Sequence, residues 1–341
     1  MTNCLANAGF NRRGRREFLR SIGVGALSLA FADTNFAAEG KPLRGLFPIG
    51  QTPCTPDNKL DLDCLAAEVT FCNRGGVHGF VWPQIASGWA DLTPQERRDG
   101  VEAILAAGKG GKTALVIGVQ TRGKIEAAIE YAKHADIHGA DAIISLPPEN
   151  ADSNAMLEYY KTIGKATDLP LFVQSIGDMS VDLVVRMFKE IPTMRVVKDE
   201  AGNPLQRVAE IRERTAGKLN VFSGNGVRTM ITEMERGFLG HCPTTGLADI
   251  YAQAFDLWHS GNKREAFDMF GRVLAFESIP NAGSYALIAR GVFKEDTITR
   301  AMTLPAGSVA VGARRSAPLD EAGKKEIREA LNTYLKPYLR G

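Results

Sequence analysis

Residues 196–202 read VVKDEAG and place one lysine, Lys198, between a β-branched pair and two acidic residues. β-Branched residues favour strands, and glycine favours the turn that follows a strand. The stretch therefore predicts a short buried strand that ends at Lys198. Lys198 is then either a nucleophile at the end of that strand or a loop lysine held in a salt bridge.

The same unit, a short apolar run followed by a helical segment, recurs along the chain. Eight runs predict strands, at 44–50, 79–82, 113–118, 142–146, 170–174, 194–198, 219–223 and 240–244. Apolar residues spaced three and four positions apart predict helices between them, as at 62–74, 93–107, 124–138, 154–167 and 181–189. Eight β/α units in about 220 residues favour an α/β fold, a (β/α)8 TIM barrel, over an open sheet.

This pattern divides the chain into three parts. Residues 1–38 predict a signal peptide, residues 39–260 the barrel, and residues 261–341 a helical extension, with a loop near 305–318, packed on the barrel. Of 341 residues, 44% are hydrophobic and 23% charged, which is typical of a chain with a large core and not of a disordered one. The net charge is only +2, with much of the basic excess in the first twenty residues, so we expect no nucleic-acid partner.

The first 38 residues predict export. Residues 11–20 carry five arginines, residues 21–32 form a short apolar run without charge, and small residues follow at Ala37 and Ala38. That order is typical of a secretory signal, and the run is short for a membrane span. The stretch RREFLR at 15–20 resembles the twin-arginine motif, which indicates a periplasmic protein that does not contact the membrane once the signal is removed. A basic amphipathic leader or an N-terminal anchor is the alternative.

Cysteines and histidines predict no metal site. Four cysteines follow the signal without a CxxC pair or a Cys/His cluster: Cys54, Cys64, Cys72 and Cys242. Cys64 and Cys72 lie about two turns apart on an expected helix, too far for a disulfide. Four histidines lie on helices or loops, where we expect no mutual ligand spacing: His78, His134, His138 and His259. His241, inside the last expected strand, is expected to be a buried structural residue rather than a catalytic one.

Chemistry in such barrels lies at the carboxyl ends of the strands. Lys198 has that position, and apolar neighbours would strip part of its hydration and leave some free amine to attack a carbonyl. Asp199 and Glu200 would keep the lysine charged if they faced it. We expect them to face away, because successive strand residues point to opposite sides.

Residues 45–277 carry further motifs in a set order. They are Thr52-Pro53, GVHGFVW at 76–82, LTPQER at 92–97, GADAIISLPP at 139–148, ATDLPLFV at 166–173, VVKDEAGN at 196–203 and FSGNG at 222–226. In this order the chain resembles the dihydrodipicolinate synthase and N-acetylneuraminate lyase family of class I aldolase-type barrels. The resemblance implies that Lys198 forms an imine with the ketone of pyruvate or another small-molecule 2-keto acid, without a cofactor. It also implies a homo-oligomer, a tetramer or a dimer.

The chain departs from the family where the keto acid would be held. The family's paired threonines are replaced within the stretch Gln84, Ile85, Ala86 and Ser87, in which Ile85 and Ala86 have no side-chain donors. Backbone N–H groups, Gln84 or Ser87 remain as groups that could hold a carboxylate.

The proton-transfer groups also differ. Gln174 replaces the family's strand-5 tyrosine, and an amide is no general acid near neutral pH. Glu149 replaces part of an aromatic pair and is either a new general base or an exposed loop acid. The candidate catalytic residues are thus Lys198, Gln174 and Glu149. The candidate substrate-binding residues are Thr52, Gln84, Ile85, Ala86, Ser87, Asn225, Arg228 and Thr244, of which Asn225 and Arg228 are alternatively a cap and a surface charge.

Two functions remain open at this point. One is an exported lyase, of the aldolase or dehydratase type, that acts through Lys198 on a sugar-derived 2-keto acid with an altered proton relay. The other is a barrel without turnover that binds a small metabolite or a protein partner. The lysine favours the first, and the missing threonines and tyrosine favour the second.

Overall fold

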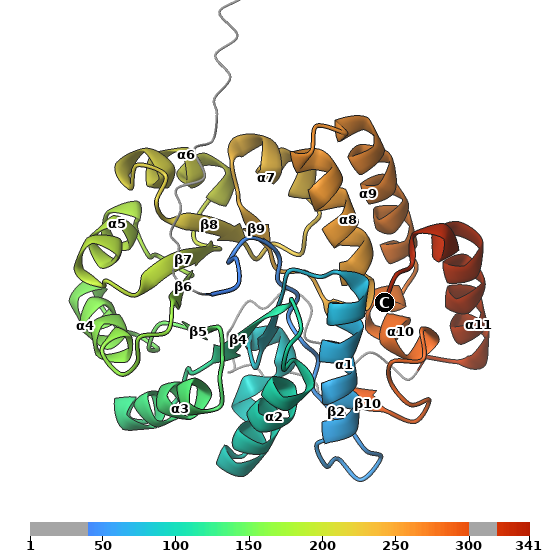
Figure 1. Cartoon of the computed structure of the whole chain (residues 1–341), viewed down its shortest axis with the longest axis horizontal. Coiled ribbons are helices and arrows are strands. Elements are labelled where there is room, and N and C mark those ends of the chain that lie inside the picture. The colour runs from blue at the N-terminus through green and yellow to red at the C-terminus, as the bar shows by residue number, and fades with distance from the viewer. Residues whose placement is uncertain (1–39, 300–318) are drawn as a thin grey trace, which may run out of the picture. The chain divides into compact units, whose positions relative to one another are not determined.

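The computed structural model describes residues 40–299 and 319–341, and within them eight parallel strands ring a central axis with helices outside (Figure 1). The strands pair in the order β1-β9-β8-β7-β6-β5-β4-β3. A parallel bridge between Ile49 and Val81 joins the first segment to β3, so the barrel is nearly closed. The predicted (β/α)8 TIM-barrel class is confirmed.

The barrel strands are β1 (Gly45–Leu46), β3 (Gly79–Trp82), β4 (Ala114–Gly118), β5 (Ala142–Ser145), β6 (Leu171–Ser175), β7 (Met194–Asp199), β8 (Asn220–Ser223) and β9 (Gly240–His241). The surrounding helices are α1 (Leu62–Gly75), α2 (Pro94–Ala107), α3 (Ile125–Ile137), α4 (Ser153–Gly164), α5 (Val181–Glu190), α6 (Pro204–Arg214), α7 (Met230–Arg236) and α8 (Ala248–His259). Three further helices follow: α9 (Lys263–Glu277), α10 (Ala282–Ala289) and α11 (Glu321–Ala330).

The first and last barrel strands are shorter than expected. We predicted strands at 44–50 and 240–244, whereas β1 and β9 contain two residues each. Pro48 and Pro243 have no N–H to donate, which interrupts the ladder although Ile49 still donates to the carbonyl of Pro243 at 2.8 Å. An antiparallel pair, β2 (Pro53–Cys54) with β10 (Ile298–Thr299), lies outside the barrel and was not predicted.

Helix starts follow from local side-chain chemistry. In α2, the Thr93 hydroxyl accepts from the N–H of Glu96, and the Glu96 carboxylate accepts from the N–H of Thr93, with Pro94 at the first helical position. Asp61 and Asp152 cap α1 and α4 more simply: each carboxylate accepts one or two hydrogen bonds from backbone N–H groups in the first turn of its helix. These caps fix the residue at which each helix begins.

The barrel interior is apolar and contains three phenylalanines. The ring of Phe47 lies 5.1 Å from that of Phe222 and 6.0 Å from that of Phe172, and all three side chains are fully buried. Phe172 and Phe222 come two residues before Gln174 and Gly224, so the side chain of Gln174 and the open position at Gly224 face the same side one layer higher. A dry floor therefore lies beneath the carboxyl ends of β6, β7 and β8.

The C-terminal helices pack beside α8 and α1 at one side of the barrel (Figure 1, orange to red). Arg290, at the end of α10, forms a bidentate ion pair with the buried Asp249 of α8, with both contacts at 2.7 Å. The N–H groups of Arg340 and Gly341 also donate to Asp249. The whole loop expected at 305–318 lies outside the described residues, as does the predicted signal peptide at 1–38. Within residues 40–299 and 319–341, no helix combines the length and apolar character needed to span a membrane.

Candidate active site

Lys198 lies at the end of β7, as predicted, and is nearly enclosed. It is only 5% exposed. Its register partner on the neighbouring β6 is Gln174, which is fully buried. Both side chains project above the phenylalanine floor, so the structure brings these two predicted catalytic residues together.

Glu200 is the carboxylate that faces Lys198, which corrects our expectation that both following acids face away. Its Oε1 lies 3.6 Å from Nζ of Lys198, and its Oε2 accepts a hydrogen bond from Nε2 of Gln174. Strand side chains alternate with a period of two, so residue 200 belongs on the side of residue 198. The period of two was visible in the sequence, and it predicts that only Asp199 faces away. Our expectation wrongly included Glu200.

Asp199 does face away, as predicted. Its side chain is fully buried behind β7, where it accepts from Nε of Arg207 at 2.9 Å and from the second guanidinium nitrogen at 3.1 Å. The same guanidinium donates to the Ser175 hydroxyl at 3.3 Å. This pair fixes the loop that carries Glu200, whose N–H donates to the Ser175 carbonyl at 2.8 Å.

Gly224, which follows β8, and Cys242, which follows β9, complete the surroundings of Lys198. A Cβ at Gly224 would lie 2.5 Å from Cε of Lys198 and still closer to the Glu200 carboxylate, so only glycine leaves room for the pair. Burial raises the pKa of the Cys242 thiol to about 12, with Lys198 acting in the opposite direction. Cys242 is therefore protonated and is no competing nucleophile.

The loop after β3 has no free side-chain hydroxyl. It forms a short 3-10 turn over Ile85–Ser87, in which the Ser87 hydroxyl donates to the carbonyl of Gly50 at 2.6 Å. The Thr52 hydroxyl donates to the Ser87 carbonyl at 2.6 Å and accepts from the indole of Trp82. Thr52 and Ser87 therefore hold the loop together, while Ile85 and the exposed Ala86 begin the turn with their backbone N–H groups.

Two buried amide oxygens have no protein partner among the described residues: Oε1 of Gln84 and Oε1 of Gln174. Gln84 is held by Nε2, which donates to Oε1 of Gln120 at 3.0 Å, and Gln120 in turn donates to the Pro83 carbonyl at 2.8 Å. An unpaired buried acceptor is costly, which points to a donor that the site receives from elsewhere.

Arg97 of α2 supports this loop from behind and was not predicted from the sequence. Its guanidinium donates to the carbonyls of Gln120 at 2.7 Å and Gly118 at 2.8 Å. The Tyr131 ring of α3 covers it, with 3.9 Å between the guanidinium carbon and the ring centroid. Burial lowers the pKa of Arg97 to about 10. The sequence signal for this role was weak: Arg97 is the last residue of the motif LTPQER at 92–97.

The other predicted residues lie at the exposed rim. Glu149 pairs with Arg122, with Nε and Oε1 3.7 Å apart, and its side chain is 64% exposed. That placement favours the exposed loop acid over the general base. Asn225, Arg228 and Thr244 are exposed in the loops after β8 and β9.

One histidine is fully buried, and the other four are half-buried or exposed. His241 is fully buried, with Nδ1 2.9 Å from Oε2 of Glu233, in agreement with a structural role. Our statement that the others lack ligand spacing was wrong for His134 and His138. They lie four positions apart at the end of α3, and both approach Glu102 of α2.

Comparisons with known proteins agree with this architecture. The model of the dihydrodipicolinate synthetase family matches residues 42–312. A 4-hydroxy-tetrahydrodipicolinate synthase of Rhizobium meliloti is 27% identical over 234 residues, which cover 63% of this chain and 79% of the relative.

Two solved structures share the fold at low identity. Dihydrodipicolinate synthase from Rhodopseudomonas palustris has a TM-score of 0.71 at 19% identity, over 85% of this chain and 97% of that chain. N-acetylneuraminate lyase from Mycoplasma synoviae has a TM-score of 0.68 at 19% identity, over 87% of this chain and 98% of that chain. Because the family match spans most of the chain, the protein belongs to the dihydrodipicolinate synthetase family, a family of lyases that form a Schiff base between a lysine and a keto acid without a cofactor.

Proposed function

We propose that the chain is a Schiff-base lyase for a sugar-derived 2-keto acid larger than pyruvate, with Lys198 as nucleophile and Glu200 as the proton-transfer group. The observation that carries the proposal is the position of Lys198 between Gln174 and Glu200, over an apolar floor. Glu200 thereby stands in for the tyrosine that Gln174 replaces.

The chemistry needs a neutral amine and a proton carrier. Glu200 takes a proton from the Lys198 ammonium, and the free amine attacks the ketone carbon, so that a C–N bond forms as the C=O π bond breaks. A proton of the attacking amine passes to the resulting oxyanion and gives a hydroxyl. Glu200 then returns the proton to the departing hydroxyl, which leaves as water and gives the imine. Gln174 holds Glu200 in place through its Nε2. The imine withdraws electrons from the adjacent carbon, so that C–C cleavage or water loss can follow.

The unpartnered acceptors support a hydroxylated substrate. Oε1 of Gln174 is buried beside Lys198, and Oε1 of Gln84 is buried at the start of the loop after β3. An acceptor is satisfied by a ligand donor, and a keto acid derived from a sugar carries several hydroxyl donors. Pyruvate carries none.

The structure of the loop after β3 is a reason to expect that pyruvate binds weakly. With the hydroxyls of Thr52 and Ser87 donating to backbone carbonyls, a carboxylate in this loop has only backbone N–H donors. A lost hydroxyl contact costs about 1 to 3 kcal/mol. A larger substrate compensates through contacts with the two glutamines and the rim.

Reductive trapping tests the proposal. Borohydride reduces an imine to a secondary amine, so we expect a hydroxylated 2-keto acid to add its mass to the peptide that contains Lys198, with a weaker adduct from pyruvate. Lys198→Met keeps the apolar stem and should give no adduct. If a broad panel of 2-keto acids leaves Lys198 unmodified in the folded protein, the protein is not a Schiff-base lyase.

A barrel that only binds a metabolite or a protein partner is the second candidate. The observation that favours it is the loss of both threonine hydroxyls and of the tyrosine phenol from the site. Binding of a hydroxylated acid in calorimetry, without any reducible adduct, would identify this function.

We also propose that the protein acts in the periplasm as a homo-oligomer. The arginine pair and apolar run of residues 1–38 support export, and the homo-oligomeric enzymes of the family support self-association. Light scattering of the purified protein measures its subunit number.

A further inference from the structure

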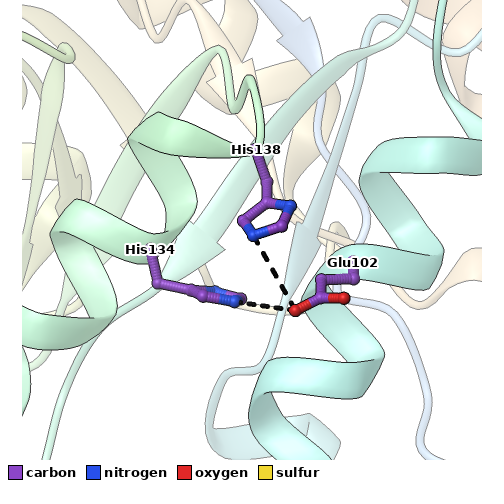
Figure 2. Close-up of side chains that lie close together, drawn as sticks. All are labelled: Glu102, His134 and His138. Atoms are coloured by element: carbon purple, nitrogen blue, oxygen red, sulfur yellow. Dashed lines mark hydrogen bonds and ion pairs between the residues drawn. The ribbon is translucent and has the colours of Figure 1, made fainter.

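We propose that Glu102, His134 and His138 form a binding site for a divalent transition metal, with Zn²⁺ as the best match to its donors. Figure 2 shows the two imidazoles from the end of α3 turned toward the Glu102 carboxylate of α2. The cluster lies between two outer helices, so it is separate from the Lys198 site at the carboxyl ends of the strands.

The distances suit one ion. Glu102 Oε1 lies 3.0 Å from Nε2 of His134 and 3.8 Å from Nε2 of His138, and the ligand atoms of all three residues are within 4.8 Å of one another. Ligands bound to Zn²⁺ in a tetrahedron are about 3.3 Å apart, given metal–ligand bonds of about 2.0 to 2.1 Å. The observed separations lie on both sides of that value, so small side-chain rotations bring the three atoms to one centre.

Local structure already orients these ligands. His134 and His138 are four residues apart, which places them on one face of the helix end, with ring centroids 4.4 Å apart. Two imidazole nitrogens and one carboxylate oxygen are the donors that Zn²⁺, Cu²⁺ and Ni²⁺ prefer, whereas Mg²⁺ and Ca²⁺ prefer oxygen ligands.

Access and coordination number agree with this choice. The side chains of Glu102, His138 and His134 are 49%, 37% and 18% exposed, so an ion reaches them from solvent. Three protein ligands leave a fourth tetrahedral position for water.

The ion would join α2 to α3. These helices already meet where the Tyr131 ring of α3 covers Arg97 of α2, and Arg97 holds the carbonyls behind the active-site loop. The metal adds a second connection between the same helices. Because an ion that binds only the folded state stabilises it by mass action, Zn²⁺ should raise the melting temperature.

Calorimetry and thermal unfolding test the site on chelator-treated full-length protein without a polyhistidine tag. We expect one Zn²⁺ per chain, a higher melting temperature with Zn²⁺, and no shift with Mg²⁺. His138→Ala and Glu102→Gln should each weaken Zn²⁺ affinity about tenfold or more. The control Glu126→Gln, which removes an exposed carboxylate from α3 outside the cluster, should bind like the wild type.

A spectroscopic measurement identifies the ligands independently of affinity. Cu²⁺ bound by the wild type should show electron paramagnetic resonance couplings to two imidazole nitrogens, and His138→Ala should reduce them to one. Absence of Zn²⁺ binding, equal affinity in His138→Ala and wild type, or a Cu²⁺ spectrum unchanged by that substitution would each overturn the site.

Discussion

Lys198 and Glu200 form a largely buried pair of opposite charge. In the proposed reaction, imine formation depends on the transfer of one proton from the lysine to the glutamate. Nζ and Oε1 are 3.6 Å apart, a distance that a shared water or a small rotation closes. Glu200 therefore lies where it can take the lysine proton, either directly after a small rotation or through a shared water.

Glu200→Gln should therefore slow imine formation. The amide keeps the size and a hydrogen bond for Gln174 but neither takes the lysine proton nor returns it to the departing hydroxyl. We expect the single-turnover rate of borohydride-trapped adduct to fall about 100-fold or more, in the range of general acid–base contributions. Glu149→Gln tests the rival carboxylate, and its rate should stay near that of the wild type because Glu149 is exposed and paired with Arg122. A slow Glu149→Gln with a normal Glu200→Gln would reverse the assignment.

At the residue scale, sequence predicted the lysine but not its partners. A strand end is visible in one segment, so VVKDEAG and the barrel rule predicted the position of Lys198. Its role as an imine-forming nucleophile was implied by the resemblance of the surrounding motifs to the family. The contacts of Glu200 with Gln174, and of Gln84 with Gln120, join side chains from different strands and loops. Their partners depend on register and rotamers that a single segment does not specify.

In the loop after β8, Gly224 leaves the space that the side chains of Lys198 and Glu200 occupy. The Gly224 backbone lies so near Lys198 and Glu200 that an added Cβ would overlap both. The overlapping atoms belong to flexible side-chain ends, so the pair would move and the barrel would stay folded.

Gly224→Ala should thus abolish or strongly reduce the Lys198 adduct while the far-ultraviolet circular dichroism spectrum is preserved. Gly271→Ala is the matched control, because a Cβ there meets no atom within 4 Å on α9. It should trap keto acid like the wild type and, as a helical glycine replaced by alanine, gain about 0.5 to 1 kcal/mol in unfolding free energy. Normal trapping by Gly224→Ala would show that the pair tolerates displacement and that the glycine is not required.

Elements were predictable where one pattern repeats. Strand β4 is a continuous apolar run buried on both faces, and in capped helices such as α2 the capping residues mark the first turn in the sequence. The exceptions have local causes: Pro48 and Pro243 shorten β1 and β9, and β10 pairs with β2 across a sequence separation that no periodicity reports.

At the scale of the whole molecule, the barrel was predicted from eight β/α alternations, which in this length favour a closed parallel sheet over an open one. The burial of Asp249 by Arg290 and the C-terminal backbone ties the helical extension to α8. That contact lay beyond sequence reasoning, because an arginine and an aspartate far apart in the chain carry no mark of their pairing.

Export is the remaining prediction for the whole molecule, and it concerns residues outside the described structure. Two arginine pairs, Arg12-Arg13 and Arg15-Arg16, precede the apolar run, and only the second is followed by the EFLR sequence that resembles the twin-arginine motif. A receptor reads that motif rather than its charge, so replacing Arg15 and Arg16 together by lysine should retain the precursor in the cytoplasm. The same change at Arg12 and Arg13 keeps the charge and the motif and should leave export intact. Cell fractionation with N-terminal sequencing measures both, with a periplasmic wild-type protein expected to begin near Ala38 or Glu39. Normal export of the Arg15 and Arg16 variant would indicate a general secretory signal instead.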